Sequence, residues 1–134
     1  MDTEIKWRAP RSVLKGLREA RVHFGLFDFA VFCIVGPHGD IQRYVEWRHG
    51  ECEPPPEAHG LHYEGPIDRA PIIWIPRIPK SPADYGTLAH EICHVVREMV
   101  VDWARMTHDK GNDEVFCHAV SYAMETLLTE LKRP

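Results

Sequence analysis

Residues 81–106 carry the strongest constraint on the fold, because they predict one long amphipathic helix. The run Ser81-Pro82-Ala83-Asp84 is typical of a helix start, with serine as N-cap, proline in the first helical position and aspartate three residues after the cap. No glycine or proline interrupts residues 87 to 110. Apolar side chains recur at helical spacing and predict one buried face: Leu88, Ile92, Val95, Val96, Met99 and Trp103.

This helix contains the run His90-Glu91-Ile92-Cys93-His94, which fits the pattern H-E-x-x-H. On a helix the two histidines lie one turn apart on one face, so both imidazoles can reach one zinc ion at about 2.0–2.1 Å. Glu91 lies about 100° around the helix from His90, where it can act as a general base over a metal-bound water. A hydrolytic zinc site needs a third protein ligand and one open position.

A last helix is predicted from Asn112 or Asp113, either of which can cap it. Its inward stripe consists of Val115, Ala119, Tyr122, Ala123, Leu127 and Leu131. Glu114 and His118 lie on one face of this helix, together with Cys117. A carboxylate on a face that leans inward needs a partner, so Glu114 is the candidate third ligand and His118 the competing one. The alternative for Glu114 is a first-turn carboxylate favoured by the helix dipole.

The two histidines, Glu91 and Glu114 together resemble the gluzincin branch of the zincin metallopeptidases, and the small size is similar to compact domains of the ImmA/IrrE type. The resemblance implies that His90, His94 and Glu114 bind Zn²⁺. It implies that Glu91 activates water for hydrolysis of a peptide bond, with a peptide or protein as substrate. Four residues after the ligand glutamate, where such families often carry Asp or Ala, this chain has His118. His118 is therefore a second-shell residue or an alternative ligand.

The remaining composition excludes several classes of protein. A chain of 134 residues is expected to form a single domain. Its net charge of −4 gives no electrostatic footprint for nucleic acid. No apolar run reaches the roughly 18 residues of a membrane-spanning helix, and the charged N-terminus lacks a signal-peptide core. The four cysteines fit no disulfide-rich secreted pattern, so we expect a cytoplasmic location.

The first half of the chain predicts a helix and a hairpin. Residues 10–24 show apolar side chains at helical spacing and predict an N-terminal helix. Residues 26–35 form an apolar run that is typical of a strand buried on both faces. Residues 41–48 alternate between apolar and polar side chains, which indicates a half-exposed strand paired with the previous one across a turn at 36–40.

Residues 49–70 predict a long loop that partly covers the site, and residues 70–78 predict a third strand. Pro71 and Pro76 cannot donate to a strand ladder, so this strand is expected at an edge of the sheet, with Trp74 beside the site. The expected fold is therefore α+β, with an N-terminal helix, a three-stranded and largely antiparallel sheet, the helix of the histidine pair and a last ligand helix. The alternative function is a non-hydrolytic zincin-like domain that binds metal and holds a protein partner.

Overall fold

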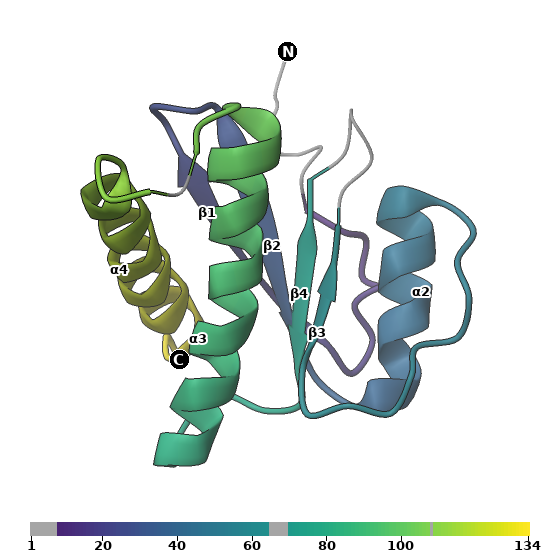
Figure 1. The fold of residues 1–134 in the computed structure, drawn as a ribbon. Coiled ribbons are helices and arrows are strands. Elements are labelled where there is room, and N and C mark those ends of the chain that lie inside the picture. The colour runs from purple at the N-terminus through teal and green to yellow at the C-terminus, as the bar shows by residue number, and fades with distance from the viewer. Residues whose placement is uncertain (1–7, 65–69, 108) are drawn as a thin grey trace.

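The computed structural model describes residues 8–64, 70–107 and 109–134, which form an α+β fold around a four-stranded mixed sheet (Figure 1). The strands are β1 (Arg18–Phe24), β2 (Phe29–Val35), β3 (Leu61–Tyr63) and β4 (Ile72–Ile75). Their order across the sheet is β1-β2-β4-β3, where β2 and β4 are parallel and the two outer pairs are antiparallel. The helices are α2 (His38–His49), α3 (Pro82–Arg97) with its π-helical continuation η1 (Glu98–Trp103), and α4 (Asp113–Leu131).

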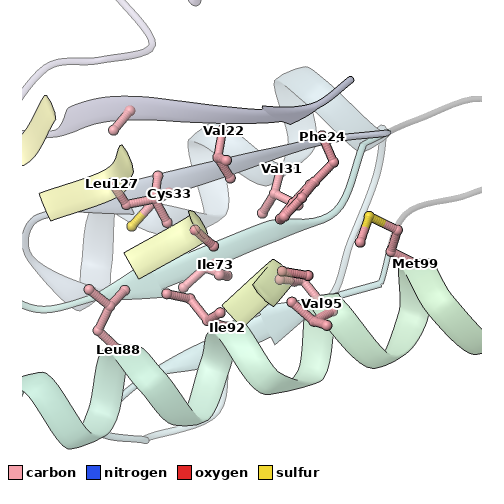
Figure 2. Packing of buried hydrophobic residues seen from close by; sticks show 14 of the residues in the cluster. Val22, Phe24, Val31, Cys33, Ile73, Leu88, Ile92, Val95, Met99 and Leu127 are labelled. Carbon is pink, nitrogen blue, oxygen red and sulfur yellow. The ribbon is translucent and has the colours of Figure 1, made fainter. Parts of the chain in front are cut away.

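The helices cover both faces of the sheet (Figure 1). Helix α2 packs on one face, where its Ile41, Tyr44 and Val45 meet side chains of β2 and β4. Helices α3 and α4 pack on the other face, and Figure 2 shows Leu88, Ile92 and other side chains of α3 directed into this larger core. Within α3 and η1 the predicted stripe is buried from Leu88 to Met99, whereas Trp103 at its end is half exposed. Burial of this stripe is the main force that seats α3 on the sheet.

The start of α3 is the predicted one. The side chain of Ser81 accepts a hydrogen bond from the backbone N–H of Asp84, whose carboxylate accepts one in return from the backbone of Ser81. Pro82 occupies the first helical position. The guanidinium of Arg77 and the backbone N–H groups of Lys80 and Ser81 hold the pKa of Asp84 well below its usual range, at about 2. This charged cap fixes where α3 begins and so sets which residues face the sheet.

The predicted N-terminal helix over residues 10–24 is wrong, because residues 18–24 form strand β1. In that strand Ala20, Val22 and Phe24 are buried on alternate positions. A spacing of four residues, as between Ala20 and Phe24, fits one helical turn and also two strand repeats. Pairing with the uniformly apolar β2, which is the predicted buried strand, decides between them in favour of the strand.

The strand predicted over residues 41–48 is also wrong, because these residues lie in helix α2. Ile41, Tyr44 and Val45 are buried at helical spacing, whereas Trp47, which the alternating pattern also placed inside, is partly exposed. The apolar residues of this short segment match both periods. The hairpin partner of β2 is instead β1, and β4 lies parallel to β2 on its other side.

The sheet therefore has four strands and mixed direction, and β4 is not at its edge. Pro71 and Pro76 flank β4 instead of lying in its ladder, so they do not disturb its pairing with both neighbours. The edge strand next to β4 is β3, which lies inside the region predicted as a loop over residues 49–70. Trp74 packs on the α2 face and donates to the backbone oxygen of Gly36, so its expected place beside the site is wrong.

None of the helices in the described ranges combines the length and the apolar character that crossing a lipid bilayer requires.

Candidate metal centre

The two histidines of α3 lie close enough to share one ion. The Nε2 atoms of His90 and His94 are 3.2 Å apart, and the two rings meet nearly edge to face, with centroids 4.8 Å apart. Two nitrogens that bind one tetrahedral zinc ion at 2.0–2.1 Å are about 3.3 Å from each other. The spacing of the Nε2 atoms therefore fits a shared zinc ion without a change of helix geometry.

Glu91 completes a compact group of potential ligands. One ligand atom from each of His90, Glu91 and His94 lies within 4.8 Å of the others, and the described residues contain no second group of this kind. Both histidines are exposed, whereas Glu91 is only 6% exposed. Two neutral imidazoles and one carboxylate suit zinc by donor type. The role predicted for this buried carboxylate, to take a proton from a metal-bound water, stays a prediction.

Strand β3 places His62 beside this group, a contact that the sequence spacing did not identify. The ring of His62 lies parallel to that of His94, with an interplanar angle of 1° and centroids 5.4 Å apart. Its Nε2 atom is 3.0 Å from Oε1 of Glu98, and both side chains are largely buried. Two residues earlier, a Cβ built on Gly60 would lie 3.1 Å from Oε2 of Glu91. Residues 60 and 62 of the segment 49–70 thus lie against the candidate group, and the expectation that this segment covers an active site stays a prediction.

The predicted ligand Glu114 and its competitor His118 are not members of this group. Oε2 of Glu114 is 3.2 Å from Nε2 of His118, and their side chains are 86% and 81% exposed. Helix α4 packs against β1 and α3, whereas α3 also contacts β4 and β3. The structure thus brings His90, Glu91 and His94 together but does not bring Glu114 or His118 to them. Ligation by Glu114 stays a prediction.

A hollow of about 360 Å³ lies along the first turns of α3, beside the candidate centre. Thr87, one turn before Glu91, is on its wall, together with His59 from the segment before β3. The pair formed by Arg77 and Asp84, whose side chains are 2.8 Å apart, lines its far end. His90, Glu91 and His94 do not line this hollow, so it is a neighbour of the group and not part of it.

Comparisons with known protein families, with curated proteins and with solved structures found no match for this chain.

Proposed function

We propose that this protein is a zinc-dependent hydrolase that cleaves peptide bonds, with His90 and His94 holding the ion and Glu91 acting as general base. The observation that carries the proposal is the 3.2 Å spacing of the two Nε2 atoms beside a buried carboxylate. The gluzincin-like sequence pattern adds the substrate class, a peptide or protein. Glu114, with His118 as the alternative, remains the sequence prediction for a further ligand.

The residues divide the chemistry in a simple way. When bound, zinc lowers the pKa of a coordinated water to about 7 and polarises the scissile carbonyl. The Glu91 carboxylate accepts the proton of the attacking water and then passes it to the leaving amine, which is the work of one positioned base and acid. His90 and His94 must stay neutral to keep their Nε2 lone pairs directed at the ion. Burial of Glu91 against Gly60 limits the rotamers from which it can act.

The experiment compares wild-type protein with Glu91→Gln after both are loaded with zinc. We expect about one zinc per chain in both proteins, because Glu91 acts as the base and is not needed to hold the ion. Cleavage of a mixed peptide library, read by mass spectrometry, should fall by about 10²–10⁴-fold in Glu91→Gln. The substitution keeps the size of the side chain and removes its ability to accept a proton.

Two results would contradict the proposal. Wild-type protein that binds no zinc after reconstitution would remove the metal centre. Equal cleavage by wild type and Glu91→Gln would remove the assigned mechanism. A zinc-loaded wild type that cleaves no peptide in the library would favour the alternative of a metal-binding domain that holds a protein partner.

A further inference from the structure

The segment formed by Gly60 and strand β3 touches the candidate centre at two points. Along an extended chain, alternate residues point to the same side, so Gly60 and His62 can face α3 together. Gly60 meets Glu91, and His62 meets His94. The two contacts involve the proposed base and one of the two proposed zinc ligands.

We propose that Gly60 and His62 are positioning residues of the metal centre: His62 fixes the ring of His94, and Gly60 leaves room for the carboxylate of Glu91. The inference rests on the proposed function and deepens it, because it names the part of the fold that holds the reacting groups in place.

The contact of His62 with His94 is anchored by a third residue. Glu98 lies one turn beyond His94 and starts the π-helix η1, and its side chain is buried. An ionised carboxylate only accepts hydrogen bonds, so the Nε2 atom of His62 donates to Oε1 of Glu98. Helix α3 thus carries His94, η1 carries Glu98, and β3 carries His62, whose ring contacts both. Such an arrangement reduces the freedom of an exposed imidazole that would otherwise sample several rotamers.

The parallel rings favour positioning over ligation by His62. An imidazole binds a metal with the ion in the plane of its ring, and two rings that are stacked in parallel planes do not share one ion. The planes of His62 and His94 differ by only 1°. In contrast, the rings of His90 and His94 are inclined by 82°, with their Nε2 atoms directed at each other. Groups that orient metal-binding histidines typically contribute about 10–100-fold to metal affinity.

The contact of Gly60 with Glu91 leaves no room for a side chain. A Cβ at residue 60 would lie 2.8 Å from Cγ2 of Thr87 and 3.1 Å from Oε2 of Glu91, so one of these groups would have to move. Glycine is therefore required here for close approach. The same approach covers the Glu91 carboxylate, which is buried although His90 beside it is exposed.

The experiment measures the zinc affinity of the full chain by competition with a coloured chelator, in wild type, His62→Phe and His62→Gln. Phenylalanine keeps a flat ring without the donor, and glutamine keeps a donor of similar reach without the ring. We expect each variant to bind zinc about 10–100-fold more weakly. The absorption spectrum of bound Co²⁺ should retain its tetrahedral intensity in both variants, because the ligands are unchanged.

Tyr63→Phe is the matched control on the same strand. Tyr63 points to the α2 side, and its hydroxyl is buried without a hydrogen-bond partner among the described residues. Removing that hydroxyl should leave zinc affinity unchanged. Urea unfolding of the metal-free proteins separates positioning from general destabilisation, since a purely structural role of His62 would lower stability and zinc affinity together.

The outcomes are distinct. If wild type binds zinc and both His62 variants bind it equally well, this inference is overturned and the proposed function still stands. A His62→Phe protein that loses the Co²⁺ spectrum as fully as His90→Ala does would make His62 a ligand and also overturn the inference. Wild type that binds no zinc would overturn the proposed function and this inference with it.

Discussion

Helices α3 and α4 each carry a pair of potential metal ligands one turn apart, and only the pair on α3 belongs to a candidate site. On α3, His90 and His94 stand beside a carboxylate that is 6% exposed. On α4, Glu114 and His118 are equally spaced, but their side chains are 86% and 81% exposed. The contact between Glu114 and His118 is an exposed ion pair only when the imidazole is protonated, and pairs of this kind contribute little to stability.

The difference comes from what stands beside each helix. Strand β3 runs along α3 and places Gly60 and His62 against the group, whereas the face of α4 that carries Glu114 is open to solvent. Correct spacing on one helix is therefore not enough to make a site. A second element that limits rotamers and excludes water is also needed, which is the general requirement for a preorganised centre.

The largest expected effect is on zinc affinity when one member of each pair is removed. His94→Ala should weaken zinc binding by more than about 100-fold, because removing a ligand lowers the affinity more than removing a group that only orients a ligand. His118→Ala is the matched variant, because His118 follows Glu114 by four residues just as His94 follows His90. We expect it to change zinc affinity by less than about tenfold. Equal losses in the two variants, measured by chelator competition, would show that both helices contribute ligands.

A second test removes the predicted third ligand. If the spacing on α4 locates a ligand, Glu114→Ala should lower zinc affinity by more than about 100-fold and exceed the effect of His118→Ala. Because Glu114 is exposed and contacts His118, a change below about tenfold would remove it as a ligand. A large loss in Glu114→Ala would mean that its carboxylate leaves His118 when the ion binds.

The features that were predictable from the sequence are those with local signals. The start of α3 is encoded by Ser81 and Asp84, its buried face by regular apolar spacing, and the histidine pair by a separation of four residues. The uniform apolar run of β2 likewise identifies an interior strand. In each case the deciding interactions lie within a few residues of one another along the chain.

The remaining features depend on contacts between distant segments. β3 has only three residues, too few for a periodic pattern, and it becomes a strand by pairing with β4. His62 and Glu98 are 36 residues apart, so their contact leaves no trace in local spacing. The sequence holds one signal: His62 lies in a segment that also contains His49 and His59. Its spacing alone did not link it to His94.

A smaller effect is expected from Gly60→Ala, which tests the close approach of residue 60 to Glu91 directly. The added methyl should displace Glu91 and slow peptide cleavage by roughly 10–100-fold, in line with the cost of a small misplacement of a catalytic group. Zinc content should stay at the wild-type level. Gly86→Ala is the control, because a Cβ at that position of α3 meets nothing within 4 Å. Adding Thr87→Ser to Gly60→Ala removes the closest clashing methyl and should restore part of the rate.

The smallest expected effect concerns the starts of the two helices. α3 begins with a charged capping box, whereas Asn112 at the start of α4 makes no side-chain capping bond. The pKa of Asp84 is lowered from 3.8 to about 2, first by the hydrogen bond from Arg77 and then by the backbone N–H groups of Lys80 and Ser81. A lowered pKa means that the folded state favours the charged carboxylate. Its stabilisation is therefore fully present above about pH 4 and is lost as the pH falls towards 2.

Asp84→Asn should accordingly melt at a lower temperature than wild type near pH 6, and this difference should shrink as the pH falls from 4 to 2. Other carboxylates titrate in both proteins, so the difference between the two melting temperatures isolates Asp84. Asp113→Asn, in the first turn of α4, is the matched control and should show a smaller difference at pH 6, because it removes no capping box. A melting difference for Asp84→Asn that stays constant from pH 6 to pH 2 would show that the charge of Asp84 does not fix the start of α3.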